Sequence, residues 1–288
     1  MFEKEVVLPL IKQAIKEDVG NGDHTSLATI PETATGKAVL VAKEEGIIAG
    51  MDIAELTYKT IDPNTVFTAL KQDGGKINIG DRIFEVEGLS RSILTAERLS
   101  LNYIQRMSGI ATHTYRLVKT VKESGSTTTL LDTRKTTPNN RVFEKAAVRI
   151  GGGSNHRFGL FDMILIKDNH IDFAGGITKA LDKVRDYLSD TGRQLKVEIE
   201  VRTMAELQEV LEWGEKNPNG LHRVMFDNFT PDRLKEALEV TAKKYETEAS
   251  GGITEKNLLD YAATNVDFIS IGALTHHIKA LDLSLKAE

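Results

Sequence analysis

The sequence has 288 residues, 40% of them hydrophobic and 27% charged, which is an ordinary globular composition with room for one large domain or two modest ones. It contains no cysteine, which excludes disulfides, thiolate metal sites and a cysteine nucleophile. The formal net charge of −5 argues against broad nucleic-acid binding. No apolar run approaches the roughly 20 residues that span a bilayer, and the first residues lack the apolar stretch of a signal peptide. We therefore expect a cytoplasmic protein with neither a membrane nor a nucleic acid as its partner.

The first third of the chain has the pattern of a small α+β unit. An amphipathic helix is predicted at residues 8–16, and β-rich runs follow at residues 37–42 and 83–87. A long helical stretch then covers residues 92–107, and Gly109 is expected to end it. This predicts a domain boundary after residue 110.

Beyond that boundary, short apolar strands alternate with amphipathic helices, as in parallel β/α units. The predicted strands cover residues 129–131, 163–166, 197–199, 224–226, 247–249 and 268–271. The predicted helices cover residues 178–188, 204–213, 231–244 and 255–262. Six or seven such strands favour a barrel over an open sheet only slightly.

Polar residues follow each of these strands, where the active site of a parallel β/α fold lies. They are Asp132 to Lys135, Lys167 to Asn169, Glu198 with Glu200, Asp227 with Asn228, Ser250 to Gly252, and Gly272. Loop exposure alone explains any one of them better than function does. Six such groups together indicate a functional site.

The stretch from residue 132 to residue 170 is basic, although the whole chain is acidic. Its seven Lys and Arg residues face four acids, so 7 − 4 gives a local charge of +3. Arginine binds carboxylate or phosphate with two hydrogen bonds, and lysine acts as a point charge on phosphate. This favours an anionic substrate, although Arg141, Lys145 and Arg149 lie at helical spacing and are equally compatible with a solvated helix face.

Three further features are ambiguous on their own. Two glycine stretches, residues 151–153 and 250–252, would let backbone N–H groups approach an anion, yet glycine runs are more often simple turns. Glu200 and Asp227 could hold ribose hydroxyls, position Mg²⁺ or stabilise a sugar cation, and could equally be salt-bridge partners. His156 is compatible with proton donation, carboxylate binding or a structural role.

Three segments carry a specific resemblance: Asp132-Thr133-Arg134-Lys135-Thr136-Thr137-Pro138, Gly151-Gly152-Gly153-Ser154-Asn155-His156-Arg157, and Ile166-Lys167-Asp168-Asn169-His170. In this order they resemble the quinolinate phosphoribosyltransferase family, and the similarity extends over nearly the whole chain. The family often has glycine after the proline, where this chain has Asn139. Asparagine tolerates a positive φ, so we expect the turn to be preserved.

The resemblance implies an α/β fold with two domains of the type II phosphoribosyltransferase kind. An N-terminal α/β sandwich would comprise residues 1–110 joined by a C-terminal helix at residues 274–288, and an open α/β barrel would comprise residues 111–273. It further implies a homodimer with shared active sites. The implied reaction joins quinolinate and phosphoribosyl diphosphate, with Mg²⁺ and no organic cofactor, to give nicotinate mononucleotide, diphosphate and CO2 in de novo NAD biosynthesis.

The resemblance also assigns roles to individual residues. The quinolinate carboxylates would be surrounded by Thr133, Arg134, His156, Arg157 and, from the other subunit, Arg98. The diphosphate would face Lys135 and Lys167, while Glu200 and Asp227 would hold the ribose and its metal. The backbone cradle for a phosphate would be formed by Ser250, Gly251, Gly252 and Gly272. Of these residues, Lys135, Glu200 and Asp227 would be catalytic.

Two alternatives remain open at this point. One is a related phosphoribosyltransferase that takes nicotinate and releases no CO2. The other is a catalytically silent paralogue that binds a phosphorylated metabolite on a retained barrel. Loss of Lys135, Glu200 or Asp227 would favour the silent paralogue, and all three residues are present.

Overall fold

The computed structural model describes residues 3–288 and divides into two compact units. The first unit contains the chain up to Arg116, Thr136–Gly152 and Leu274–Glu288, and the second contains Leu117–Lys135 and Gly153–Ala273. The segment 136–152, which the predicted boundaries assign to the barrel, thus lies in the first unit. It is held there because the Glu144 carboxylate accepts hydrogen bonds from the Arg106 guanidinium.

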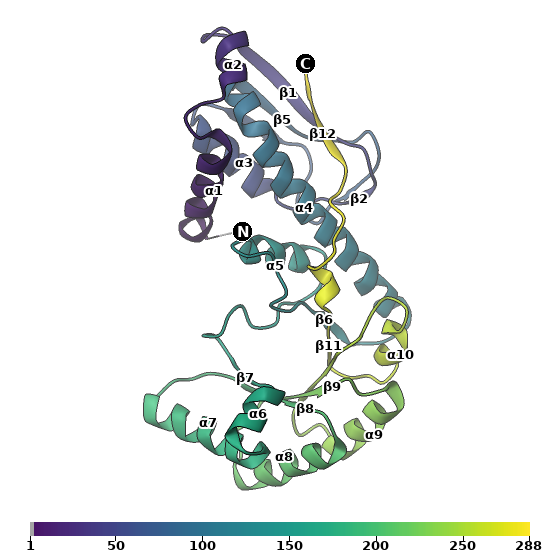
Figure 1. Cartoon of the computed structure of the whole chain (residues 1–288). Coiled ribbons are helices and arrows are strands. Elements are labelled where there is room, and N and C mark those ends of the chain that lie inside the picture. Colours follow the sequence, from purple (N-terminus) through teal and green to yellow (C-terminus); the bar gives the residue numbers. More distant parts are fainter. Residues whose placement is uncertain (1–2) are drawn as a thin grey trace. The chain divides into compact units, whose positions relative to one another are not determined.

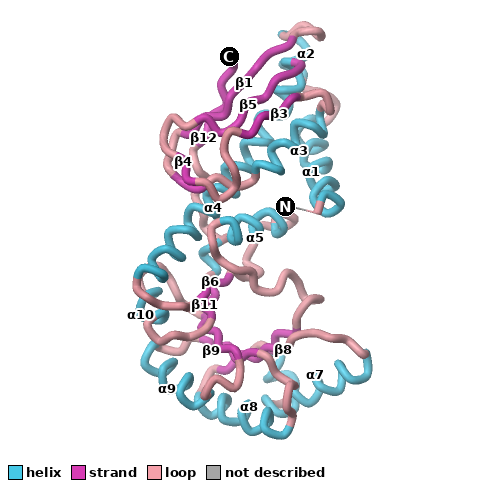
Figure 2. Tube along the Cα trace, turned by 180° about the vertical axis from the view of Figure 1, so that it is seen from behind, coloured by secondary structure: helices cyan, strands magenta, loops and turns pink. Residues whose placement is uncertain are grey.

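The first unit is built on a four-stranded antiparallel sheet in the order β12-β1-β5-β3. Its strands are β1 (Thr35–Ala42), β3 (Val66–Ala69), β5 (Arg82–Leu89) and β12 (Leu283–Ala287), with a separate ladder of β2 (Gly46–Ile47) and β4 (Lys76–Ile77). Its helices are α1 (Lys4–Val19), α2 (His24–Thr29), α3 (Met51–Ile61), most of α4 (Ser90–Glu123) and α5 (Arg141–Ile150). Figure 2 shows the strands of this sheet side by side.

One face of this sheet packs against helices. Alternate residues of β1, among them Leu40, share a buried cluster with Tyr58 of α3 and Ile104 of α4. The ring of Phe84 on β5 lies edge-on to Tyr58, with 6.0 Å between centroids. This layer of helices on one sheet confirms the predicted α/β sandwich.

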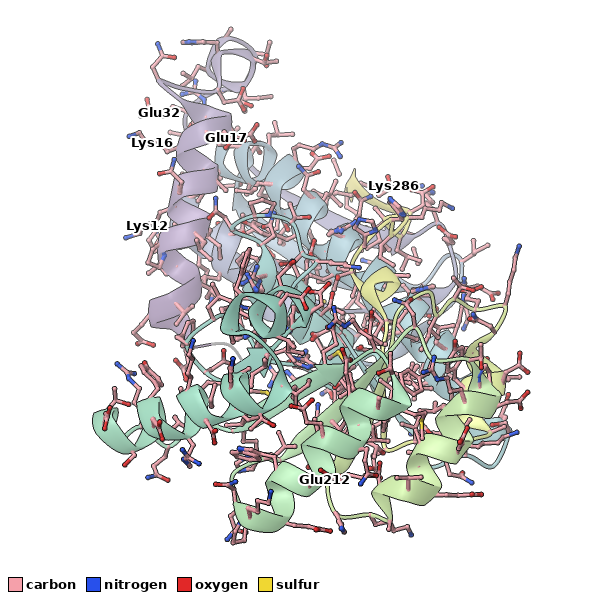
Figure 3. The ribbon with its side chains drawn as sticks, turned by 60° about the horizontal axis from the view of Figure 1, so that its bottom comes forward. Lys12, Lys16, Glu17, Glu32, Glu212 and Lys286 are labelled. Atoms are coloured by element: carbon pink, nitrogen blue, oxygen red, sulfur yellow. The ribbon has the colours of Figure 1, made fainter. Side chains whose placement is uncertain are left out.

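Helix α1 has the amphipathic pattern expected of a surface helix. Val7 and Ile11, four residues apart, are buried, whereas Lys12 and Lys16 are exposed. Figure 3 shows Lys12 and Lys16 on the outer side of α1. The turn after Pro138 is also preserved, because Asn139 adopts a φ of 64°.

The prediction that Gly109 ends a helix is wrong, because α4 runs without a break from Ser90 to Glu123. Gly109 is required inside the helix by packing, since a Cβ there would overlap the carbonyl oxygen of Lys279. The missing side chain lets the C-terminal segment pass close to the helix. Although α4 is long, neither it nor any other helix in residues 3–288 is apolar enough over its length to cross a membrane.

The predicted C-terminal helix at residues 274–288 is also wrong. The segment holds the end of a short 3-10 helix (Gly272–Leu274) and then β12, which pairs antiparallel with β1. The cause is visible in the sequence, because Leu281, Leu283 and Leu285 alternate with polar residues, a period of two that is typical of strands. Leu283 and Leu285 pair with Ala42 and Leu40.

The second unit is a six-stranded parallel sheet in the order β6-β11-β10-β9-β8-β7. Its strands are β6 (Thr129–Leu131), β7 (Ile164–Ile166), β8 (Val197–Val201), β9 (Arg223–Asp227), β10 (Glu246–Ser250) and β11 (Phe268–Ser270). Its helices are α6 (Asp168–Ala174), α7 (Ile177–Thr191), α8 (Met204–Lys216), α9 (Pro231–Thr241) and α10 (Leu258–Ala262). All six predicted strands are confirmed.

This sheet curves into a barrel that stays open. Figure 1 shows α7, α8 and α9 along the outside of the strands. Within residues 3–288 no ladder joins the end strands β6 and β7, which confirms the predicted open barrel.

The two faces of the barrel strands differ in chemistry. On β8 the residues Val197, Ile199 and Val201 form a continuous apolar face, while Glu198 and Glu200 point to the opposite face. All five are buried, so the carboxylates lie inside the barrel rather than in solvent. Barrel interiors are commonly filled by branched apolar side chains, so the charges in this interior need a separate explanation.

Replacing Gly109 by alanine tests the close packing along α4. In an ordinary helix this change stabilises by about 1 kcal/mol, but here the new methyl group meets backbone, so we expect a loss of about 1–3 kcal/mol in the free energy of unfolding. Urea denaturation of Gly109→Ala measures it. Asn102→Ala, at an exposed position of the same helix, is the control and should stay within about 0.5 kcal/mol. Wild-type stability of Gly109→Ala would contradict the packing argument.

Candidate active site

Acidic and hydroxyl side chains lie at the carboxyl ends of three neighbouring strands. Glu200 lies near the end of β8, Asp227 ends β9, and Ser250, which pairs with Asp227, ends β10. From the end of β7, the Lys167 ammonium reaches to 3.3 Å from a carboxylate oxygen of Glu200. Burial raises the pKa of Glu200, Lys167 opposes the rise, and Asp227 adds to it. The two acids therefore interact electrostatically, and the Lys167 cation lies beside Glu200.

The buried Asp132 joins two stretches of chain that are 20 residues or more apart in sequence. Its carboxylate accepts a hydrogen bond from the Asn155 amide at 2.5 Å and one from the backbone N–H of His156 at 2.9 Å. Backbone hydrogen bonds extend the connection, because Ser154 donates to the Leu130 carbonyl and Asp132 donates to the Ser154 carbonyl. The segment after β6 and the segment 154–157 are thus held side by side.

This arrangement brings two arginines together. The Arg157 side chain is buried and donates to the Met163 carbonyl at 3.2 Å. Burial lowers the pKa of Arg157, and the nearby Arg134 cation lowers it further. Two guanidinium groups that repel each other at a strand end are stabilised by a ligand with two negative charges.

The glycines at the ends of β10 and β11 allow close approach. Gly251 and Gly252 have positive φ angles of 90° and 63°, and a Cβ on Gly251 would overlap the Asn228 side chain. A Cβ on Gly272 would lie 3.0 Å from the side chain of Lys135, so Lys135 extends over that backbone. At Gly251 and at Gly272 the absence of a Cβ therefore lets a neighbouring side chain lie close to the backbone.

A buried charge cluster lies inside the same barrel. The His156 side chain is 6% exposed, and its Nε2 lies 3.0 Å from Glu198 and 3.4 Å from Glu248, both fully buried. The Arg223 guanidinium donates to Glu248 at 2.7 Å and to Glu246 at 2.8 Å. Burial lowers the pKa of His156, but the two glutamates raise it more, to about 9. Burial and the Glu248 charge raise the pKa of Glu198 to about 7.

All predicted site residues except Arg98 belong to the second unit. Arg98 lies exposed on α4 in the first unit. Local contacts join them in small groups: Thr133 with Lys135 and Gly272, Lys167 with Glu200, and Asp227 with Ser250. The full set in this unit is Thr133, Arg134, Lys135, His156, Arg157, Lys167, Glu200, Asp227, Ser250, Gly251, Gly252 and Gly272.

Sequence reasoning assigned no role to Asp132, Asn155, Arg223 or Glu248, and it noted Glu198 only as polar. The sequence did carry a signal for Glu198, Arg223 and Glu248, which lie within predicted strands or directly before one. A charged residue on one face of a strand whose other residues are mostly apolar indicates a barrel interior rather than a loop. Asp132 and Asn155 stand inside the motif segments, but nothing in their spacing indicates that they bond to each other.

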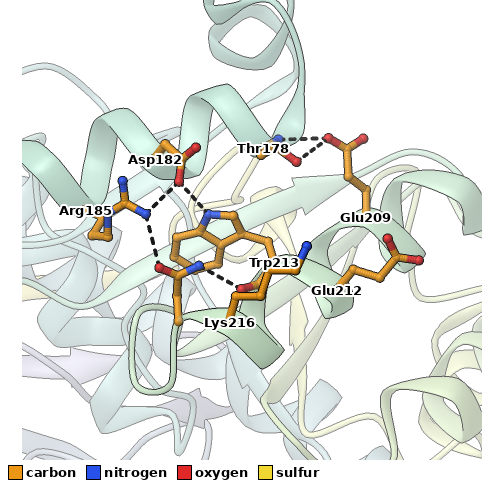
Figure 4. A pocket seen from close by; sticks show the side chains of 8 residues that line it. Thr178, Asp182, Arg185, Glu209, Glu212, Trp213 and Lys216 are labelled. Atoms are coloured by element: carbon orange, nitrogen blue, oxygen red, sulfur yellow. Dashed lines mark hydrogen bonds and ion pairs between the residues drawn. The ribbon is translucent and has the colours of Figure 1, made fainter.

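Two cavities lie away from these residues. One, of about 360 Å³, lies between α7 and α8 (Figure 4), where Asp182 accepts from the Trp213 indole and the Arg185 guanidinium. The other, of about 500 Å³, lies in the first unit beside Tyr103 and Asn140. Neither is lined by a predicted site residue.

Comparison with protein families gives two matches that together cover most of the chain. "Quinolinate phosphoribosyl transferase, N-terminal domain" matches residues 23–108, and "Quinolinate phosphoribosyl transferase, C-terminal domain" matches residues 110–286.

Individual proteins give the same result. The chain is 44% identical to quinolinate phosphoribosyltransferase (decarboxylating) 1b of Nicotiana tabacum over 97% of this chain and 81% of that protein. It is 41% identical to a probable nicotinate-nucleotide pyrophosphorylase (carboxylating) of Bacillus subtilis over 96% and 91%. The solved nicotinate-nucleotide pyrophosphorylase of Francisella tularensis superimposes with a TM-score of 0.91 at 41% identity, covering 100% of this chain and 98% of that one. Human nicotinic acid phosphoribosyltransferase, at a TM-score of 0.62 and 13% identity over 96% and 73%, shares the fold.

The role of Asp132 as the connection between the two segments can be tested by its removal. Asp132→Ala leaves the Asn155 amide and the His156 N–H without their acceptor, so we expect a loss of about 3 kcal/mol in the free energy of unfolding, and less for Asp132→Asn. Denaturant titration measures both. Asp162→Ala is a matched control, since that exposed carboxylate also accepts two backbone N–H groups and should cost about 1 kcal/mol. Equal losses at the two positions would contradict this role.

Proposed function

Because this chain belongs to the quinolinate phosphoribosyl transferase family, we propose that it transfers the phosphoribosyl group of phosphoribosyl diphosphate to quinolinate with loss of CO2. The products are nicotinate mononucleotide, diphosphate and CO2, in de novo NAD biosynthesis. The observation that carries the proposal is the end-to-end match to relatives with this activity in their names. The strand-end acids and the paired arginines supply the chemistry that the reaction needs.

The transfer step separates charge, and the site has groups for both signs. Breaking the bond between ribose C1 and the diphosphate builds positive charge on the sugar and negative charge on the leaving group. Glu200 and Asp227, on paired strands, stabilise the sugar cation. Lys135 and Lys167 stabilise the departing diphosphate. Preorganised charges of this kind lower the barrier because they do not have to reorient during the reaction.

Quinolinate binding and decarboxylation follow from the cationic side of the site. Arg134 and Arg157 bind the two carboxylates, with Thr133 and the partner subunit's Arg98 completing the set. Once the pyridine nitrogen carries the ribose it is cationic, and it can hold the electron pair that remains when the neighbouring carboxylate leaves as CO2. The pyridinium therefore acts as the electron sink for decarboxylation, and the reaction requires no organic cofactor.

Mg²⁺ is part of the proposal. Magnesium prefers oxygen ligands and is usually held by one or two carboxylates together with substrate phosphates and water. Glu200 and Asp227 offer such oxygens at neighbouring strand ends, and the Lys167–Glu200 contact leaves the second oxygen of Glu200 for other partners. When bound, the ion would neutralise diphosphate charge.

The two alternatives make different demands on the site. A nicotinate-specific enzyme has one carboxylate to bind, which leaves one of two adjacent arginines, the buried Arg157 or the exposed Arg134, without a counter-charge. A catalytically silent paralogue only binds its ligand, so it does not need two interacting acids to stabilise a developing positive charge. Similarity to the human nicotinic acid enzyme extends to the fold alone.

Location and assembly are also proposals. We expect a cytoplasmic homodimer whose active sites take Arg98 from the neighbouring subunit. Some plant relatives are named chloroplastic or mitochondrial, so family membership does not fix the compartment. Cell fractionation tests the cytoplasmic location, and analytical ultracentrifugation tests the homodimer.

The proposed reaction is tested with quinolinate labelled in the carboxyl group next to the ring nitrogen. Labelled CO2 should be released only when phosphoribosyl diphosphate is present. Nicotinate should react with a kcat/KM lower by at least about a hundredfold, because a site built for two carboxylates keeps an unpaired cation when one is missing. Comparable kcat/KM for the two acids would support the nicotinate alternative, and no turnover of either would support the silent paralogue.

Shared sites are tested by mixing two inactive variants. If Arg98 acts across the dimer, refolding an equal mixture of Arg98→Ala and Lys135→Ala chains makes half of the dimers mixed, and each mixed dimer has one intact site. Activity should then recover toward about a quarter of the wild-type value, as twofold symmetry requires.

The matched control mixes Lys135→Ala with Asp227→Ala. Both residues come from one barrel, so every site in every dimer keeps a defect and no activity should return. If the Arg98 mixture also stays inactive while tagged chains prove that mixed dimers formed, Arg98 does not act across the dimer.

A further inference from the structure

A buried ion pair between Arg106 of α4 and Glu144 of α5 has no part in the proposed chemistry. The Glu144 side chain is 1% exposed, and one of its oxygens accepts from the Arg106 guanidinium at 2.9 Å and 3.2 Å. A buried carboxylate is costly unless hydrogen bonds satisfy it. The other partners of Glu144 and Arg106 show which segments of the chain this pair holds.

Glu144 holds the chain that follows Lys135. Its carboxylate accepts the Thr137 hydroxyl at 2.8 Å and the Thr137 backbone N–H at 3.1 Å. Thr137 is two residues after Lys135 in the chain. Asp132, three residues before Lys135, is held by its own hydrogen bonds to the segment 154–157. Lys135 therefore lies between two points of the chain that buried carboxylates keep in place.

Arg106 holds the chain that follows Gly272. Its guanidinium donates to the Thr275 carbonyl at 2.7 Å and to the Ile278 carbonyl at 3.1 Å. Thr275 is three residues after Gly272, whose backbone lies close to the Lys135 side chain. Lys135 and Gly272, which lie close together, are thus each followed within three residues by a segment that the same ion pair binds.

Packing gives little support to the first of these segments. Thr137, Pro138 and Asn139 are exposed, and a cavity of about 500 Å³ lies beside Pro138 and Asn140. A loop with few packing partners changes its position readily unless hydrogen bonds hold it. The two hydrogen bonds to Glu144 supply a constraint of this kind.

We propose that Arg106 and Glu144 are positioning residues for Lys135: they fix the segments after Lys135 and after Gly272, so that the ammonium group is kept beside the Gly272 backbone to meet the diphosphate. Neither residue of the pair contacts substrate. The proposal rests on the proposed function for the identity of the diphosphate, whereas the hydrogen bonds exist in the free protein. Replacing a buried ion pair by apolar residues is often neutral for stability, so stability alone does not explain the pair.

The first test measures the anchoring without any substrate. Glu144→Gln keeps one oxygen acceptor but removes the charge that binds Arg106. Hydrogen exchange of peptides that cover residues 133–140 should become about tenfold faster in this variant, while peptides of β9 and β10 should be unchanged. Wild-type exchange at residues 133–140 would overturn the proposal. Faster exchange throughout the chain would also overturn it, because that result indicates a general loss of structure.

The second test removes one hydrogen bond and leaves the ion pair in place. Thr137→Val lacks the hydroxyl that donates to Glu144. The kcat/KM for phosphoribosyl diphosphate should fall about tenfold, while the KM for quinolinate should stay within about twofold, because the hydrogen bonds of Asp132 remain. Thr137→Ser restores the hydroxyl and should recover most of the loss. Equal effects on both substrates, or no recovery with serine, would overturn the positioning role.

The outside of the barrel offers a matched control. Thr178 of α7 makes the same two hydrogen bonds as Thr137, since its hydroxyl and its backbone N–H donate to the Glu209 carboxylate at 2.7 Å and 2.9 Å (Figure 4). Neither Thr178 nor Glu209 is a predicted site residue. Thr178→Val should keep the kinetic constants for both substrates within about twofold of wild type. A tenfold loss at this position as well would mean that any lost surface hydrogen bond lowers activity, which would overturn the proposal.

A binding measurement separates this proposal from the proposed function. If the wild type releases no CO2 from quinolinate, the proposed function fails, and inorganic diphosphate with Mg²⁺ still probes the position of Lys135. Calorimetry should give an affinity about tenfold weaker for Thr137→Val than for wild type, with Thr178→Val unchanged. Equal affinities for all three proteins would overturn the positioning role, whether or not the wild type is active.

Discussion

The fold of the site depends on one buried carboxylate, that of Asp132. It lies at the end of β6 and accepts hydrogen bonds from Asn155 and from the His156 backbone, so the chain that returns after α5 is bonded to the end of the first barrel strand. A buried carboxylate with two good donors is stable, whereas either donor alone would leave it partly unsatisfied. Thr133, Arg134 and Lys135 follow directly on one side of this connection, and Arg157 follows on the other. Their convergence is therefore a consequence of backbone hydrogen bonding, before any substrate binds.

The interior of the barrel, below the active site, also contains buried charged side chains. Layers of branched apolar side chains would fill this space at a lower electrostatic cost. Instead, Glu198, Glu248 and Arg223 occupy it, and each of them is paired. Replacing such a network with apolar residues is often neutral or stabilising in proteins, so stability alone does not account for it. The two glutamates lie within ion-pair distance of His156, so the buried acids place negative charge directly beside a histidine of the motif segments and raise its pKa.

Much of this architecture could be predicted from the sequence, and the errors have physical causes. The barrel strands were predictable because each has an apolar run bounded by polar residues, and the strand-end acids followed from the parallel topology.

The C-terminal strand was missed although Leu281, Leu283 and Leu285 alternate, because its partner β1 lies more than 240 residues away and the resemblance suggested a helix. Gly109 was wrongly predicted to end the helix, because the sequence does not distinguish a glycine that ends a helix from one that lets a neighbouring backbone pass close to it. The Asp132–Asn155 hydrogen bond and the ion pairs of His156 with Glu198 and Glu248 depend on distances between side chains, which no spacing rule contains.

In the free protein, charges of the same sign lie close together in the active site and destabilise one another. Burial and Arg134 lower the pKa of Arg157, and burial and Asp227 raise the pKa of Glu200, so like charges are held together on both sides of the site. Each pair costs free energy while the site is empty, since the charged form is disfavoured by burial and by its neighbour. A dianionic pyridine relieves the arginine pair on binding. The carboxylate pair is relieved most when the sugar becomes positive, which happens in the transition state and not in the bound substrate. The same arrangement of charges therefore favours binding on its basic side and catalysis on its acidic side, and the division follows from which charge exists before the reaction and which only develops during it.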